Sequence, residues 1–268
     1  MKNSIITSIK GLVVGSSMLL PGVSGGTMAI ILGIYDKLIH CISSFKKDIK
    51  KNILFLLQFG IGAVLGIILF SNIVLKAVES FKFPMHFLFM GAVLGSIPAL
   101  LKKTKKEFFN IKDIFIILAG FLVVFGLSKI PSGFFVFEKL DFISFFVLLL
   151  AGFIVAVALI LPGISASQML LLLGIYEMVL NSLSEFNILI LVPIAAGGIM
   201  GIILTTGILE KAMTKFPKVT YLFIIGFVLG SILDIFPGIP MFSQIPICLI
   251  TFLVGFSAIY FLSKFSKE

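Results

Sequence analysis

The chain has 268 residues, of which 59% are hydrophobic and 12% are charged, and its formal net charge is +9. Soluble domains average about 25% charged residues, so this composition excludes a soluble globular protein. The 21 basic residues are all lysines. In a chain this apolar they indicate loops beside a bilayer rather than a nucleic-acid surface. Cys41 and Cys248 match no metal or disulfide spacing, so we expect no metal, cofactor or nucleic-acid partner.

Ten apolar segments follow one another along the chain, five before residue 135 and five after residue 141. A helix of about 20 apolar residues crosses a bilayer, so the sequence predicts an all-α polytopic integral membrane protein. The segments cover residues 4–20, 26–44, 52–78, 84–101 and 111–130, then 142–161, 167–182, 187–213, 219–235 and 241–263.

The two halves of the chain carry the same motif. Residues 21–36 read PGVSGGTMAIILGIYD, and residues 162–177 read PGISASQMLLLLGIYE. Shorter matches continue to the end of each half at a nearly constant offset, which is too long a period for a solenoid. The sequence therefore predicts a duplication, with a first repeat at 1–135 and a second repeat at 141–268.

The lysines indicate that the two repeats have opposite orientations. Five lysines lie in each of the loops 37–51 and 102–112, whereas the corresponding loops 178–187 and 234–243 have none. Lysine-rich short loops stay in the cytoplasm, so corresponding loops face opposite sides of the membrane. This predicts inverted-topology repeats with both termini cytoplasmic and 17 of the 21 lysines inside.

Each motif is expected to break a membrane helix. Asp36 and Glu177 follow their turns by about ten residues, a helical rise of about 15 Å. That rise is half of a hydrocarbon core of about 30 Å, so a turn at mid-depth would return both charges to the interface. We therefore expect a re-entrant helix hairpin plus three transmembrane helices in each repeat. Ten full spans is the alternative.

The motif turns have the chemistry of an anion site. Irregular backbone is tolerated at membrane depth only where protein buries it or water reaches it, and the N-terminus of the following helix favours an anion. Paired broken helices in inverted repeats indicate a transport site near the midplane, and a helix break that serves packing alone is the other interpretation. The candidate phosphate-binding residues are Pro21, Gly22, Ser24, Gly25, Gly26 and Thr27 in the first copy, and Pro162, Gly163, Ser165, Ser167 and Gln168 in the second.

Other polar residues give weaker signals. Asp36, Glu177, Tyr35 and Tyr176 are candidate coupling or gating residues, with a role at the membrane interface as the alternative. His40 and His86 have no apparent partners, and we expect both to be incidental. Lys76 and Lys211 occupy matching positions, where they would either receive a head group at each face or extend their amines to the interface.

An enzyme that hydrolyses lipid pyrophosphate is the less favoured alternative. Such chemistry needs an acid–base or nucleophile set and a cationic clamp on the phosphates. The chain has no arginine, and neither histidine is near a motif. We therefore predict a transporter rather than an enzyme.

The two motifs together resemble those of the bacterial polyprenyl-phosphate transporter family (PopT-like proteins), and the resemblance covers essentially the whole chain. It implies a multi-pass protein of the bacterial cytoplasmic membrane that returns undecaprenyl phosphate to the cytoplasmic leaflet for cell-wall polymer synthesis. Proton coupling is a further hypothesis, because phosphate has a second pKa of about 6. A small-anion or other solute transporter with the same broken-helix site is the alternative function, and the oligomeric state stays open.

Overall fold

The computed structural model describes residues 2–18, 24–104, 110–131, 133 and 142–265, and its regular structure over these ranges is helical. The first half contains α1 (Lys2–Ser17), α2 (Gly25–Ile31), α3 (Tyr35–Ser43), the short 3₁₀ helix η1 (Phe45–Lys47), α4 (Ile49–Ser80), α5 (Lys82–Lys103) and α6 (Ile111–Lys129). The second half contains α7 (Phe142–Ile160), α8 (Ala166–Leu173), α9 (Tyr176–Ser184), α10 (Ile188–Lys215), α11 (Pro217–Ile235), η2 (Phe242–Gln244) and α12 (Ile245–Phe265).

Many of these helices can cross a membrane. In the described residues, seven helices are long and apolar enough to span it, namely α4, α5, α6, α7, α10, α11 and α12. The number rises to nine if each of the bent pairs α2–α3 and α8–α9 counts as one span. The chain is therefore a polytopic membrane protein, as its composition predicts.

The second segment of each half contains a break that the sequence analysis did not predict. The chain bends by 117° between α2 and α3 and by 106° between α8 and α9. Gly33 and Gly174 lie at the breaks with φ of 62° and 77°, a backbone region that glycine adopts without steric cost. The single helices expected over 26–44 and 167–182 are therefore wrong. The rise calculated along them to Asp36 and Glu177 does not hold either.

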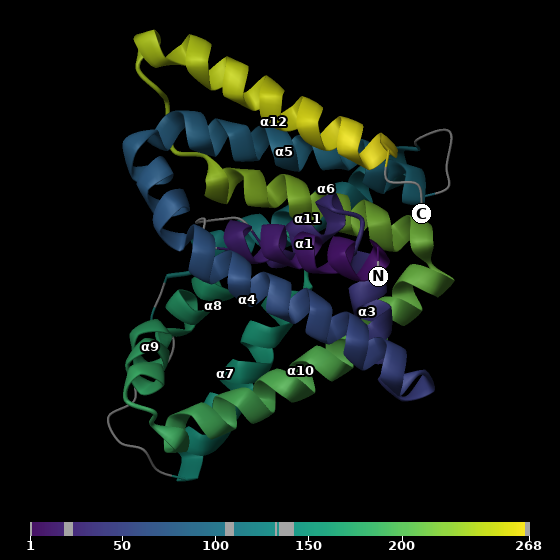
Figure 1. The fold of residues 1–268 in the computed structure, drawn as a ribbon, viewed down its shortest axis with the longest axis vertical. Coiled ribbons are helices and arrows are strands. Elements are labelled where there is room, and N and C mark those ends of the chain that lie inside the picture. Colours follow the sequence, from purple (N-terminus) through teal and green to yellow (C-terminus); the bar gives the residue numbers. More distant parts are fainter. Residues whose placement is uncertain (1, 19–23, 105–109, 132, 134–141, 266–268) are drawn as a thin grey trace.

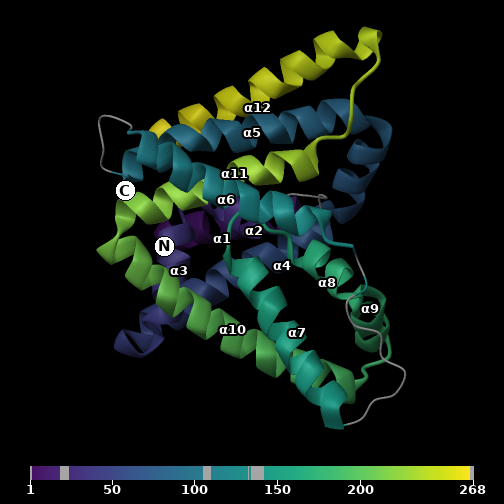
Figure 2. The same cartoon turned by 180° about the vertical axis from the view of Figure 1, so that it is seen from behind.

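Four close helix pairs build the molecule (Figures 1 and 2). Helix α1 packs along α4 and α7 along α10, while α5 pairs with α12 and α6 with α11. Glycines allow these backbones to touch, as small residues do at membrane helix interfaces. A Cβ at Gly11 would lie 2.2 Å from the carbonyl oxygen of Phe59, and one at Gly152 would lie 2.1 Å from that of Ile194. The tight contacts therefore recur at matching positions of the two halves.

One end of the helix bundle gathers the lysine-rich segments. Figure 1 shows the start of α1, the end of α3, the α10–α11 junction and the end of α12 on the same side. Ion pairs also join helix ends: Lys103 at the end of α5 binds Asp36 at the start of α3. Lys218 at the start of α11 binds Asp113 in the first turn of α6. The α4–α5 and α11–α12 junctions lie at the opposite end.

Candidate substrate site

The first motif leads directly into α2. Ser24 is the N-cap residue of this helix, although its side chain makes no capping hydrogen bond. Ser24 and Thr27 are both buried, and Gly25 and Gly26 form the first turn. The candidate residues Pro21 and Gly22 lie outside the described residues.

The second motif forms a turn between α7 and α8. Pro162 and Gly163 are buried, and Gly163 has a φ of +84°. A Cβ at Gly163 would lie 2.4 Å from the carbonyl oxygen of Phe227 on α11, so the turn packs directly against that helix. The hydroxyl groups of Ser165 and Ser167 lie 2.9 Å apart.

The two motifs meet inside the protein, although 141 positions separate them in the sequence. The backbone N–H of Gly163 donates a hydrogen bond of 2.9 Å to the hydroxyl oxygen of Thr27. A Cβ at Gly26 would lie 3.2 Å from Cα of Pro162. The hydroxyl group of Tyr35 donates to the carbonyl oxygen of Ile160 at 2.9 Å. The start of α2 is therefore attached to the turn of the opposite half.

Different cavities adjoin the two motifs. Beside Gly25 and Gly26 there is a cavity of about 300 Å³ with an almost entirely apolar lining that includes Phe59 and Ile202. A cavity of about 10 Å³ lies beside Ser165 and Gln168, and this is room for about one water molecule. The first cavity can hold hydrocarbon, whereas the second is too small for a phosphate group.

Asp234 also lines the small cavity at the second motif, together with Ser128. Both residues come from helices outside the motif, α11 and α6. Neither residue is among the site residues predicted from the sequence. Asp234 is followed by the breaker pair Pro237-Gly238, which indicates the end of a helix but not its position beside the second motif.

Asp36 connects the start of α3 to two other helices. The hydroxyl group of Tyr221 on α11 donates a hydrogen bond of 3.0 Å to its carboxylate, and Lys103 at the end of α5 forms a salt bridge with the same oxygen. Tyr35 is buried beside it. The corresponding residues of the second half differ, because Glu177 is exposed and Tyr176 is only partly buried.

The opposite end of α3 contacts α10 through Glu210. His40 and Ser43 approach its two carboxylate oxygens, and Ser44 donates to it at 3.3 Å. The expectation that His40 has no partner is therefore wrong. A usable signal was present in the sequence, since Glu210 is the one acidic residue of the apolar segment 187–213. Nothing in the sequence indicated which residues it meets.

Comparison with known proteins places this chain in a family. A family model described as "VCA0040-like: Undecaprenyl phosphate translocase-like" matches residues 14–245. The chain belongs to this family. Among similar curated proteins, a polyprenyl-phosphate transporter of Staphylococcus aureus is 32% identical over 98% of this chain and 97% of its own length. A polyprenyl-phosphate transporter of Vibrio cholerae is 29% identical over 88% of this chain and 78% of its own length. No solved structure matches the chain.

Proposed function

We propose that this protein translocates a polyprenyl phosphate, such as undecaprenyl phosphate, across the bacterial cytoplasmic membrane. Membership of the translocase-like family supports this function, as do the two relatives that are named polyprenyl-phosphate transporters. The proposed location of the substrate site rests on the hydrogen bond between Gly163 and Thr27. It brings the polar, broken-helix motifs of both halves to one place within a bundle of membrane helices.

The transported lipid has two parts with different needs. Its phosphate requires hydrogen-bond donors, because an unpaired buried charge is very costly. The motif hydroxyls would supply such donors once the cavity of about 10 Å³ beside Ser165 and Gln168 widens. Its polyprenyl chain needs apolar surface, which the cavity beside Gly25 and Gly26 provides. A small hydrophilic anion would have no use for that cavity, so its apolar lining favours a lipid substrate over the solute alternative.

The two halves are proposed to be inverted-topology repeats with both termini in the cytoplasm. The pairing of α5 with α12 and of α6 with α11 supports this arrangement, because each half contributes one helix to each pair. The gathering of the lysine-rich segments at one end supports the orientation. Whether the bent helices are re-entrant stays a prediction.

Cysteine labelling tests this topology. With Cys41 and Cys248 replaced by alanine, we expect Lys46→Cys to be protected from an impermeant maleimide added to intact cells. Phe242→Cys, at the opposite end, should be labelled. The reverse pattern would contradict the proposed orientation, and labelling of both sites would contradict a single topology.

Helix α3 is proposed to act as the gate on the lysine-rich side. Asp36 binds Lys103 and Tyr221, while Glu210 binds the other end of the helix. Release of these contacts would expose the motifs to the cytoplasmic leaflet. In this account Asp36 holds the gate closed. Proton coupling through Asp36 and Glu177 stays a separate prediction, which transport rates insensitive to an imposed pH gradient would contradict.

Reconstitution tests the proposed function. Purified protein in liposomes should move the phosphate group of undecaprenyl phosphate between leaflets, measured as head-group accessibility over time. A parallel experiment measures uptake of inorganic phosphate by the same vesicles. Protein-dependent lipid movement without phosphate uptake is the expected result. Phosphate uptake without lipid movement would replace the proposal with the solute transporter.

A further inference from the structure

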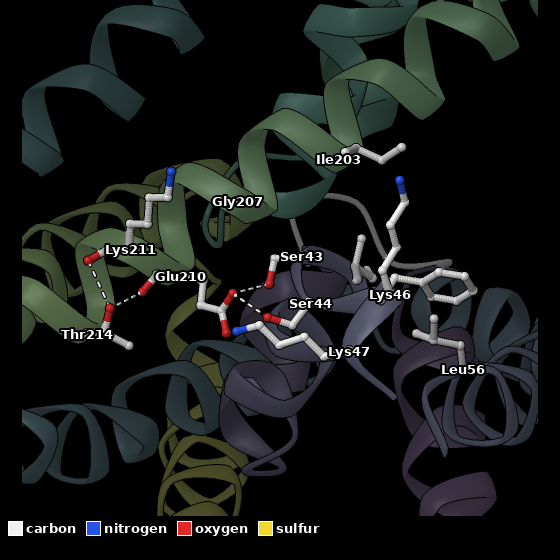
Figure 3. A pocket seen from close by; sticks show the side chains of 12 residues that line it. Ser43, Ser44, Lys46, Lys47, Leu56, Ile203, Gly207, Glu210, Lys211 and Thr214 are labelled. Atoms are coloured by element: carbon white, nitrogen blue, oxygen red, sulfur yellow. Dashed lines mark hydrogen bonds between the residues drawn. The ribbon is translucent and has the colours of Figure 1, made fainter. Parts of the chain in front are cut away.

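A second cavity lies apart from the motif turns, between the end of α3, η1, the start of α4 and the last part of α10 (Figure 3). Its volume is about 870 Å³. We call it the lysine cavity, because Lys46, Lys47 and Lys211 line it together with a single carboxylate, that of Glu210. Figure 3 shows Lys46 and Lys47 extending from η1 toward α10. The excess of positive charge favours an anionic ligand.

The lysine cavity contains hydrogen-bond donors in an arrangement that already holds an anionic group. The hydroxyl groups of Ser43 and Ser44 donate to one carboxylate oxygen of Glu210, and His40 approaches the other. A phosphate oxygen would accept from the same donors. The Glu210 carboxylate therefore occupies the positions that an external anion would take, and the two would compete.

The other walls of the lysine cavity are apolar. Ile42, Leu56 and Ile203 line it beside the polar groups. Ile42 also lines the cavity of about 300 Å³ that adjoins Gly25 and Gly26. The two cavities therefore adjoin at Ile42, and α3, α4 and α10 each contribute residues to both linings. A ligand with a charged head and a long apolar chain matches these adjoining polar and apolar surfaces. Free phosphate would make no use of the apolar walls.

We propose that the lysine cavity binds the phosphate group of a polyprenyl phosphate at the cytoplasmic face, with the first isoprene units against Ile42, Leu56 and Ile203. This inference rests on the proposed function and adds a head-group site distinct from the motif turns. The carboxylate of Glu210 is the internal competitor for Ser43 and Ser44. Lipid binding at this cavity displaces it, which releases α10 from the end of α3.

Binding of radiolabelled farnesyl phosphate to the purified protein in nanodiscs tests the proposal. Lys46→Ala/Lys47→Ala should weaken binding by about 25-fold, since each lysine near an anionic lipid head group contributes about a factor of five. Lys50→Ala/Lys51→Ala removes the same charge from the adjacent start of α4, outside the cavity lining, and should change binding by less than about twofold. Glu210→Gln should strengthen binding, because the competing charge is lost.

Equal losses in the two double variants would overturn the proposal, because they would indicate a general charge effect. Unchanged binding in Lys46→Ala/Lys47→Ala would overturn it as well. Inorganic phosphate is the second probe, and displacement of farnesyl phosphate at equal concentration would contradict the lipid assignment. Movement of undecaprenyl phosphate by the unaltered protein separates the two claims. If the unaltered protein moves undecaprenyl phosphate but the cavity variants bind farnesyl phosphate normally, only the proposal of a lysine-cavity site is overturned.

Discussion

At the scale of single residues, Thr27 joins the two motifs. Its side chain is 1% exposed, and its hydroxyl oxygen accepts the hydrogen bond from the N–H of Gly163. Gly163 cannot easily move away, because its backbone lies against Phe227 of α11. The hydroxyl oxygen of Thr27 therefore satisfies a buried backbone donor of the second motif.

Replacement of Thr27 by valine keeps the shape of the side chain but removes this acceptor. We expect Thr27→Val to lower the free energy of unfolding by about 1–2 kcal/mol, the size of a hydrogen bond between membrane helices, and to slow lipid movement. Thr27→Ser keeps the hydroxyl group and is the matched control. Thermal unfolding in one detergent provides the comparison. Equal melting temperatures for the two variants would show that the hydrogen bond contributes nothing.

At the scale of elements, close helix contacts set the positions of the motif turns. On α10, a Cβ at Gly197 would lie 1.8 Å from the carbonyl oxygen of Leu149 on α7. The neighbouring Gly198 has more room, since its Cβ would lie 3.9 Å from the carbonyl oxygen of Gly152. Because α7 leads directly into the second motif, a change in the α7–α10 contact also moves the turn.

These two glycines make a paired test on one helix. Gly197→Ala should force α7 away from α10 and cost about 1–3 kcal/mol of stability, as overpacking does. Gly198→Ala should be neutral or stabilising by up to about 1 kcal/mol, because alanine favours a helix more than glycine does. The unfolding midpoints of the two variants, measured in the same detergent, test this difference in stability. Similar destabilisation by both changes would contradict the close packing of these helices.

The motifs and the bent helices that follow them show which parts of the fold could be predicted from the sequence. The apolar composition predicted a polytopic helical membrane protein, which the long apolar helices confirm. The duplicated motifs predicted a substrate site at two matching turns, and that site stays a prediction. The breaks at Gly33 and Gly174 carried a signal too, a glycine at matching positions, but the apolar pattern runs through both and favoured one helix. The meeting of His40 with Glu210 was beyond prediction, since packing alone brings residues 170 positions apart together.

At the scale of the whole molecule, two similar halves adopt different contacts. Helix α3 packs against α10, whereas α9 makes no comparable contact with α4 in the described part of the chain. Alternating access requires that the two sides of the site differ in each state. In the proposed account, this asymmetry corresponds to a state closed on the lysine-rich side, because α3 is held by contacts at both ends.

The most direct test of the account is movement of undecaprenyl phosphate in proteoliposomes by the unaltered protein, Gly26→Val and Gly60→Val. A side chain at Gly26 would press on Pro162 of the second motif, whereas a Cβ at Gly60 meets nothing within 4 Å. We predict lipid movement by the unaltered protein and Gly60→Val, with strong loss in Gly26→Val. Equal movement by all three would contradict a site at the paired motifs, and no movement by any would contradict lipid translocation.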